Sequence, residues 1–267
     1  MLRDDPISED QIILIDKPAG ISSFGVVAKV RARLRDQFKH KVKVGHAGTL
    51  DPFATGLLIL LSGKMTKKSS EFLKLDKIYE ATLKLGYTST TGDPEGQIRK
   101  YLIEDISEPG KARISAISPV ADSPRRREKN ELVRSSETTT GGRLQSTGEI
   151  DACPKLSIIE FVLGSFIGEI NQTPPKFSAI KVNGQRAYKL ARKGTDFEIP
   201  SRKVKIYSID ILNYNYPELK IRVHCSSGTY IRTLAEDIGE ALGTGAYLTA
   251  LRRTNIANYS VDDALML

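Results

Sequence analysis

Few side chains in this sequence have a type and a setting that could support catalysis, and Asp51 is the first of them. It lies in residues 45–52, which read Gly-His-Ala-Gly-Thr-Leu-Asp-Pro. A carboxylate can act as a nucleophile and needs no redox group or energy source to do so. The setting also suits a turn residue or a helix N-cap, with Pro52 in the first helical position. Taken alone, the segment favours this structural role.

Other common catalytic and cofactor-binding patterns are missing from the sequence. His40, His46 and His224 do not show the spacing of metal ligands, and Cys153 and Cys225 form no Cys-x-x-Cys pair. The sequence has neither a phosphate-binding Gly-x-x-x-x-Gly-Lys-Ser/Thr loop nor a dinucleotide-binding Gly-x-Gly-x-x-Gly motif. We therefore expect chemistry from side chains alone, with no metal and no cofactor.

Charge and composition indicate a polyanionic partner and a reducing compartment. The formal net charge is +8 and the isoelectric point is near 9.3, which favours nucleic acid as partner, although many soluble proteins are also basic. Two cysteines cannot build a disulfide framework. The N-terminus lacks the features of a signal or transit peptide, and no apolar run reaches the length of a membrane span. These features predict a cytoplasmic protein.

The elements that must position Asp51 follow from periodicity. Residues 12–15 predict a buried strand, and Ser22 or Ser23 can cap a helix whose apolar stripe runs from Val26 to Leu34. Residues 78–85 alternate between polar and apolar, which predicts a strand with Tyr79 on its apolar face. Alternation over 219–225 predicts another strand. The turn at Gly228 precedes an amphipathic helix from Ile231 to Leu242.

The middle of the chain differs in composition. Residues 107–152 are rich in Ser, Thr, Gly, Pro and charge, which predicts a disordered insertion. The favoured interpretation is an inert insert, and an RNA-contacting arm built on Arg125-Arg126-Arg127 is the alternative. Beyond it, Ser157 and Glu160 have capping-box spacing before a helix. A strand over 177–182, a tight turn at 183–184 and a short helix over 185–193 are expected next.

Strands and helices mix without a repeated strand-helix-strand unit, which favours an α+β fold and one domain over 1–267.

Seven segments of the chain resemble the motifs of a known family. The segment around Asp51, followed by Ala54-Thr55-Gly56-Leu57-Leu58, resembles the catalytic motif of the bacterial tRNA pseudouridine-55 synthases. Six further segments resemble that family in order: 14–23, 77–79, 92–96, 174–179, 225–239 and 251–253. Seven ordered motifs make a chance match very improbable.

The resemblance implies a pseudouridine synthase fold with a central mixed, largely antiparallel sheet flanked by helices and loops. It also implies isomerisation of uridine 55 in the T-arm loop of tRNA by a monomer that flips the base and uses neither cofactor nor guide RNA. Breaking a C–N glycosidic bond and rejoining the base through carbon requires a nucleophile, which Asp51 would supply. Attack at the sugar and attack at the base both remain open.

The resemblance assigns roles that each have an ordinary structural alternative. Arg232 would pair with Asp51, and Tyr79 would stack on the target base; otherwise they are a surface charge and a core tyrosine. His46 would displace the target nucleotide from the folded arm. Tyr230 and Leu251 would line the pocket, with core packing as the alternative. Phosphate or active-site contacts are implied for Lys17, Lys67 and Arg253, which could equally be solvated charges. Asp93 fits a turn and is a further candidate for the site.

One departure from the family pattern concerns the C-terminus, because most bacterial members carry a small RNA-binding domain there and we expect it to be absent here. The insertion could compensate through its arginine run. Two rival functions stay open. A guide-RNA-dependent pseudouridine synthase shares the fold and the aspartate motif but needs the C-terminal domain. A non-catalytic tRNA-binding or folding protein is less consistent with Asp51, Tyr79 and Arg232 occurring together.

Overall fold

The computed structural model describes residues 8–102, 153–182 and 184–267. Within these ranges a ten-stranded mixed sheet runs in the order β14-β1-β3-β12-β4-β11-β10-β7, with β2 joined to β3 and β13 to β12. Two of its pairings, β1 with β14 and β3 with β12, are parallel, and the others are antiparallel. The expected α+β class with a mixed, largely antiparallel sheet is therefore confirmed.

The sheet strands have these bounds: β1 Ile12–Lys17, β2 Val44–His46, β3 Thr55–Ser62, β4 Lys77–Leu85, β7 Gly168–Gln172, β10 Arg202–Asn215, β11 Glu218–Cys225, β12 Ala246–Ile256, β13 Tyr259–Ser260 and β14 Leu265–Met266. Two small hairpins lie outside the sheet, formed by β5 Tyr87–Ser89 with β6 Ile98–Lys100 and by β8 Lys181–Val182 with β9 Gln185–Arg186. The helices are α1 Ser23–Phe38, α2 Ser69–Leu73, α3 Leu156–Ser165, α4 Ala187–Arg192 and α5 Ile231–Ala241, with 3-10 turns η1 Gly63–Lys68 and η5 Val261–Asp263.

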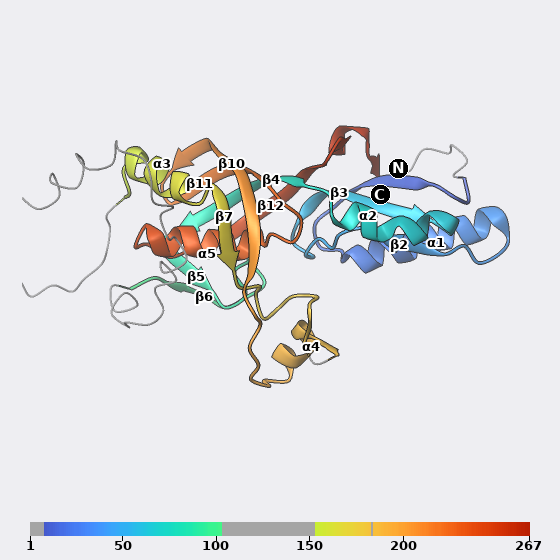
Figure 1. Ribbon diagram of the computed structural model, residues 1–267, viewed down its shortest axis with the longest axis horizontal. Coiled ribbons are helices and arrows are strands. Elements are labelled where there is room, and N and C mark those ends of the chain that lie inside the picture. Colours follow the sequence, from blue (N-terminus) through green and yellow to red (C-terminus); the bar gives the residue numbers. More distant parts are fainter. Residues whose placement is uncertain (1–7, 103–152, 183) are drawn as a thin grey trace, which may run out of the picture.

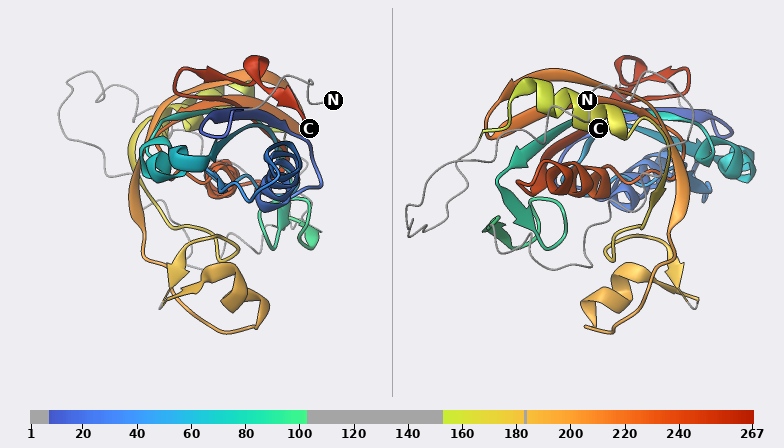
Figure 2. Two further views of the ribbon diagram at one scale, coloured as in Figure 1. Left: turned by 90° about the vertical axis from the view of Figure 1, so that its right-hand side faces the viewer. Right: turned by 60° about the vertical axis from the view of Figure 1, so that its left-hand side comes forward.

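The molecule is elongated, with α1, α2, β1 and β3 toward one end and α3 and α5 toward the other (Figure 1). The sheet curves around α5, while α4 projects away from the body (Figure 2). A cluster of buried side chains from β4, β11, β12, α3 and α5 fills the space on the concave side. A second cluster packs α1 against β1 and β3.

Strand β3 is buried on both faces, which explains its unbroken run of apolar residues. Leu58 and Leu60 pack toward α1, whereas Leu57, Ile59 and Leu61 pack into a third cluster on the other face. Such a run lacks the alternation that marks a half-buried strand, so periodicity did not predict it. The strand nevertheless carries the loop with Asp51 at its start.

Several expected elements are confirmed. Ser22 is the N-cap of α1, and its side chain accepts a hydrogen bond from the Gly25 backbone N–H at 3.0 Å. The strands β1, β4 and β11 and the helix α5 form where the alternation and the amphipathic stripe placed them. The predicted insertion at 107–152 lies outside the described residues. The organisation of 1–267 as one domain stays a prediction.

Two local predictions are wrong. The helix α3 has Lys155 as its N-cap and no side-chain cap, so Ser157 and Glu160 lie inside the helix and form no capping box. The segment 177–182 forms a strand only at Lys181–Val182, because Pro174 and Pro175 lead into a series of bends before it. A strand, β7, also intervenes between α3 and the two prolines.

A single glycine permits the close approach of β3 and β12. Gly56 has φ = +100°, and a Cβ atom there would lie 2.3 Å from the backbone oxygen of Arg253. No side chain fits, because the clash is with backbone and the conformation itself is strained for other residues.

We therefore expect Gly56→Ala to lower the free energy of unfolding by roughly 3 kcal/mol, measured by urea denaturation. Gly164→Ala in α3 is the matched control, since a Cβ atom there meets nothing within 4 Å. That helical change should be neutral or stabilise by about 0.5–1 kcal/mol. Equal stability losses in the two variants would contradict the close-approach argument.

Candidate active site

One row of paired residues crosses the sheet and carries much of the site. Lys17 on β1 pairs with Gly56 on β3, Gly56 pairs with Arg253 on β12, and Arg253 pairs with Tyr79 on β4. Residues paired across strands direct their side chains to the same face. Because Gly56 has no side chain, the row presents Lys17, Arg253 and Tyr79 toward the loop that precedes β3. That loop, residues 47–54, contains Asp51.

The loop is anchored by hydrogen bonds on both sides of Asp51. The Ser23 hydroxyl donates to the Leu50 carbonyl at 2.9 Å and accepts from the Leu50 N–H at 2.8 Å. On the other side, the Pro52 carbonyl accepts from the Gly20 N–H at 2.8 Å. The backbone groups of Leu50 are buried, so leaving them without the Ser23 hydroxyl is costly. The backbone before and after Asp51 is thus fixed.

Lys17 is an internal anchor of the same loop. Its ammonium donates to the carbonyl oxygens of Pro18, Ile21 and Pro52 at 2.9, 2.8 and 3.1 Å, and the residue is fully buried. All three of its N–H groups therefore have protein acceptors. Burial lowers the pKa of Lys17 to about 8, and nearby Asp51 opposes that shift. A phosphate role for Lys17 would require it to leave these partners.

Arg253 has a similar position on β12. Its guanidinium donates to the Leu57 carbonyl through Nε at 2.8 Å and to the Gly48 carbonyl through Nη2 at 3.1 Å. The residue is 1% exposed. The structure thus places Lys17 and Arg253 inside the protein as supports of the loop, and neither is a solvated surface charge. Their contact with RNA stays a prediction. Lys17 interacts electrostatically with Asp51, and Arg253 contacts the same loop at Gly48.

Arg232 contacts the Asp51 carboxylate directly. Its Nη2 donates to Asp51 Oδ1 at 3.3 Å, and its Nε lies 3.0 Å from Oδ2 without hydrogen-bond alignment. The Arg232 side chain is 4% exposed and that of Asp51 is 33% exposed. The carboxylate is therefore the accessible member of the pair. A buried cation that holds an accessible carboxylate is suited to orienting it toward a bound molecule.

The remaining contacts of Arg232 fix its own position. Its Nη1 lies 3.2 Å from Asp93 Oδ2 and donates to the Thr91 carbonyl at 2.9 Å. Its Nη2 donates to the Phe177 carbonyl at 2.9 Å. Asp93, also buried, accepts from the Thr91 hydroxyl at 2.5 Å and the Glu95 N–H at 3.0 Å. Asp93 therefore belongs to the site as the second carboxylate on Arg232.

The electrostatic balance at Asp51 has opposing parts. Burial raises the pKa of Asp51, Arg232 lowers it, and Asp93 raises it again. Burial also raises the pKa of Tyr79, against the lowering effect of nearby Arg253. Burial and Arg253 together lower the pKa of His46. At neutral pH these directions favour an uncharged tyrosine and an uncharged histidine near a carboxylate paired with arginine.

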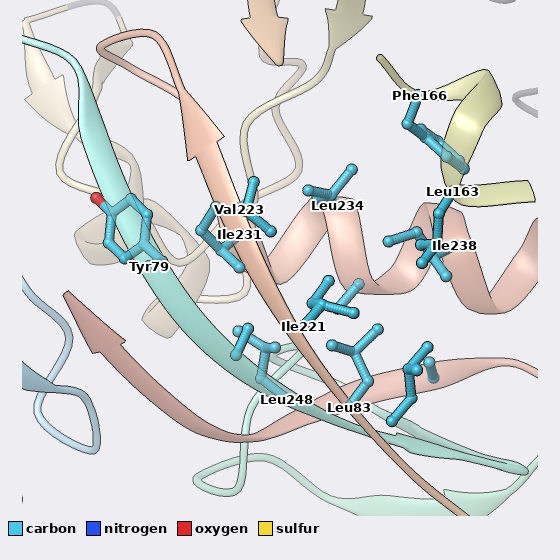
Figure 3. Close-up of a cluster of buried hydrophobic side chains, with 14 of the residues drawn as sticks. Tyr79, Leu83, Leu163, Phe166, Ile221, Val223, Ile231, Leu234, Ile238 and Leu248 are labelled. Carbon is cyan, nitrogen blue, oxygen red and sulfur yellow. The ribbon is translucent and has the colours of Figure 1, made fainter. Parts of the chain in front are cut away.

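Apolar side chains form one wall of the site. Tyr79 and Leu251 belong to the main core cluster together with Leu50, next to Asp51. Figure 3 shows Tyr79 at the end of this cluster, with its hydroxyl directed away from the labelled aliphatic side chains. Tyr79 is 8% exposed, so little of its ring is free for a base in this conformation. Stacking on a base requires the side chains that cover Tyr79 to move.

The other expected site residues are less uniform in position. Tyr230 directly precedes α5 and lies two residues before Arg232, half-buried. His46 ends β2, and its Nδ1 is buried without a hydrogen-bond partner among the described residues. Lys67 is exposed in η1, beyond the far end of β3 from Asp51. An RNA contact of Lys67 stays a prediction.

Sequence reasoning missed two residues that support the site. Ser23 was considered as a helix cap, but it is the buried partner of Leu50. Gln172 was not considered, although it is 1% exposed and binds the backbone of Tyr230. The only available signal would have been a polar residue at a position that is buried. Whether Ser23 and Gln172 are buried depends on long-range pairing, which the local sequence does not show.

A separate cavity of about 260 Å³ lies at the opposite end of β4 and is lined by Gly86, Tyr87, Lys100, Tyr101, Tyr216, Pro217 and Thr244. Leu85 lies six residue steps along β4 from Tyr79, which corresponds to about 20 Å. The cavity lacks the converging carboxylate and guanidinium groups found at Asp51, so we place the site at Asp51.

Among the described residues, no His, Cys, Asp and Glu side chains are grouped to hold a metal ion. No described helix has the length and apolarity to cross a membrane.

The two adjacent serines allow a test of the loop anchors. We expect Ser23→Ala to lower the free energy of unfolding by roughly 2–4 kcal/mol, because both backbone groups of Leu50 lose their partner. Hydrogen exchange over residues 47–54 should rise as well. Ser22→Ala removes only an exposed helix cap, should cost about 1 kcal/mol, and should leave exchange in the loop unchanged. Identical exchange in both variants would contradict an anchoring role for Ser23.

Two family models match this chain. The family model described as TruB family pseudouridylate synthase (N terminal domain) matches residues 35–122 and 130–231. The model described as tRNA pseudouridylate synthase B C-terminal domain matches residues 232–267. The two matches meet inside α5, between Ile231 and Arg232.

Curated relatives named tRNA pseudouridine synthase B match most of the chain. Those of Phocaeicola vulgatus and Bacteroides fragilis are 42% and 40% identical over 259 residues, which is 96% of this chain and 90% and 91% of theirs. The relative from Bifidobacterium longum subsp. infantis is 38% identical, and the chain spans 64% of its length.

Solved structures share the fold. One, entitled "Crystal Structure of a Cbf5-Nop10-Gar1 Complex", gives a TM-score of 0.60 at 26% identity and covers 97% of this chain and 53% of that one. Another, entitled "Structure of H/ACA RNP bound to a substrate RNA containing 2'-deoxyuridine", gives 0.55 at 24% identity over 96% of this chain and 50% of that one, which shows the fold alone. The sequence matches and the arrangement around Asp51 lead to one conclusion: this chain belongs to the TruB family of pseudouridylate synthases.

Proposed function

We propose that the chain converts uridine 55 in the T-arm loop of tRNA to pseudouridine, with Asp51 as the nucleophile and without a cofactor. Curated relatives carry the name tRNA pseudouridine synthase B, which supports tRNA as substrate. One observation carries the proposal: the accessible carboxylate of Asp51, on a fixed loop, is held by the buried guanidinium of Arg232. The net positive charge of the chain favours association with RNA.

The isomerisation needs no external electrons or atoms. The bond between N1 of uracil and C1′ of ribose breaks, the base rotates, and a new bond forms between C5 and C1′. The hydrogen on C5 leaves as a proton, and N1 ends protonated. Asp51 can serve by attack at C1′ or at the base, and both routes use an ionised carboxylate. Arg232 favours this ionised form by its positive charge.

The target base has to leave its stack to reach Asp51, at a cost of a few kcal/mol. Tyr79 and Leu251 offer an apolar wall that can repay part of that cost by contact with the base. His46, kept uncharged by burial and by Arg253, can approach the T-arm loop without adding charge. Tyr79 also has a hydroxyl near Arg253, which makes it a candidate for proton transfer from C5.

Two rival functions differ from this proposal in measurable ways. The titles of the structural neighbours include an H/ACA ribonucleoprotein, so a guide-RNA-dependent synthase is one rival. A protein that binds or folds tRNA without catalysis is the other. Catalysis on bare tRNA excludes both. The ion pair of Asp51 with Arg232 favours catalysis, because binding alone gives no reason to bury an arginine behind an accessible carboxylate.

The direct experiment incubates the protein with an unmodified tRNA transcript, without guide RNA or cofactor, and maps pseudouridine by site. We expect product at position 55 alone. Asp51→Asn should reduce the rate by roughly 10⁴-fold or more while tRNA binding persists. Asp263→Asn, at an exposed carboxylate in η5, is the control that should retain full activity. Product formed by Asp51→Asn at a rate close to that of the unaltered protein would overturn the nucleophile assignment, and binding without product in the unaltered protein would favour the non-catalytic rival.

The pH dependence of the rate tests the ionisation of Asp51. Because burial raises its pKa above the ordinary value of 3.8, kcat should fall as the pH is lowered through a value above 3.8. Arg232→Met removes the cation that opposes this rise, so the acid limb should move to higher pH by about one unit or more. Single-turnover rates measured between pH 4.5 and 8 give the acid limb of the unaltered protein and that of Arg232→Met. An acid limb at the same pH in Arg232→Met would show that the limb does not report the ionisation of Asp51.

A further inference from the structure

A buried glutamine joins the end of β7 to the start of α5. Gln172 Oε1 accepts from the Tyr230 N–H at 2.7 Å, and Gln172 Nε2 donates to the Tyr230 carbonyl at 3.0 Å. The amide thus binds both backbone groups of one residue. Tyr230 is the N-cap of α5 and has no side-chain cap hydrogen bond of its own. Gln172 therefore takes the place of a local cap from a distant strand.

The neighbour of Gln172 across the sheet holds the same turn. Arg202 on β10 pairs with Gln172 in the β7–β10 register. Its guanidinium lies 5.0 Å from the centre of the Tyr230 ring and donates from Nη2 to the Gly228 carbonyl. A Cβ atom at Gly228, where φ is +85°, would be 3.3 Å from Arg202 Cζ. Gln172 and Arg202 together fix the backbone and the ring orientation of Tyr230.

The first turn of α5 has two further connections to the chain that follows β7. The Thr233 hydroxyl donates to the Thr173 carbonyl at 3.5 Å, and Arg232 Nη2 donates to the Phe177 carbonyl at 2.9 Å. The position of Arg232 relative to Asp51 is thus set by the segment that begins at Gln172. A displacement of this turn would move Tyr230 and Arg232 together.

Gln172 occupies a buried position at which packing alone would favour an apolar side chain. Along β7, Ile170 and Gln172 are the buried positions, and the exposed residues Glu169 and Asn171 lie on either side of Ile170. An apolar side chain would fill such a position at a lower desolvation cost than an amide. A polar residue that breaks the local pattern and has both its polar atoms satisfied at the edge of a site indicates a functional constraint.

We propose that Gln172 and Arg202 form a clamp that positions Tyr230 and Arg232 for the reaction at Asp51. They are positioning residues, since Gln172 is 1% exposed and acts through the turn at 228–233. The inference rests on the proposed function for its catalytic consequence. The clamp itself can be tested by hydrogen exchange, without an assay for activity.

The test replaces Gln172 by Met, which has similar length and lacks both hydrogen bonds. Hydrogen exchange of peptides that span residues 229–235 should rise by about 10-fold. In the assay for pseudouridine, kcat should fall by about 10- to 100-fold while KM for tRNA changes by less than about 2-fold. The acid limb of kcat should move to higher pH, because a displaced Arg232 no longer opposes the rise in the pKa of Asp51. Gln172→Glu keeps an acceptor for the Tyr230 N–H and should recover part of kcat.

Ser62→Ala is the matched control for a loss of buried hydrogen bonds, because Ser62 is fully buried and bonds Gln11 at the distal end of β3. It should lower thermal stability without moving kcat or the acid limb. Unchanged exchange at 229–235 in Gln172→Met would overturn the clamp. So would normal kcat in that variant, or an equal loss in Ser62→Ala. If Gln172→Met does not fold, Gln172→Glu and Arg202→Met give the same readouts. Absence of product from the unaltered protein would count against the proposed function alone, and exchange would still decide the clamp.

Discussion

The contact between Arg232 and Asp51 is the interaction on which the rest of the site depends. Burying a guanidinium is costly unless most of its donors are paired. Arg232 meets this condition through two carboxylates, Asp51 and Asp93, and through backbone carbonyls from two other segments. The same set of contacts fixes the guanidinium in one place. The accessible carboxylate of Asp51 is therefore oriented before any substrate arrives, which is the arrangement that lowers the cost of reaching a transition state.

The loop with Asp51 relies on buried cations rather than on its own secondary structure. Lys17 and Arg253 donate to backbone carbonyls of the residues around it, and Ser23 binds both backbone groups of Leu50. Loops usually satisfy their backbone groups with water, which permits motion. Here side chains from β1, β12 and α1 replace water. The cations also lie near Asp51 and add to the positive potential that would hold an anionic RNA close to the site.

The sequence predictions failed where local signals competed with tertiary contacts. Ser157 and Glu160 have capping-box spacing, yet α3 begins earlier, since its buried residues Ile159, Val162 and Leu163 set where the helix packs. The apolar run of β3 shows no alternation because both of its faces are covered. Lys17 and Arg253 resemble surface charges in the sequence, and only the pairing of β1, β3 and β12 shows that they are internal.

By itself the sequence determined the fold class, the strands and helices with clear periodicity, the absence of common cofactor motifs and the family, because each of these depends on residue order alone. Periodicity records which face of an element is buried, and seven motifs in order identify a lineage without coordinates. Tertiary structure decided which charges meet. Asp51 and Arg232 are 181 positions apart, and Gln172 and Tyr230 are 58 apart. Contacts of that range arise from strand pairing and helix packing, whose geometry no local pattern encodes.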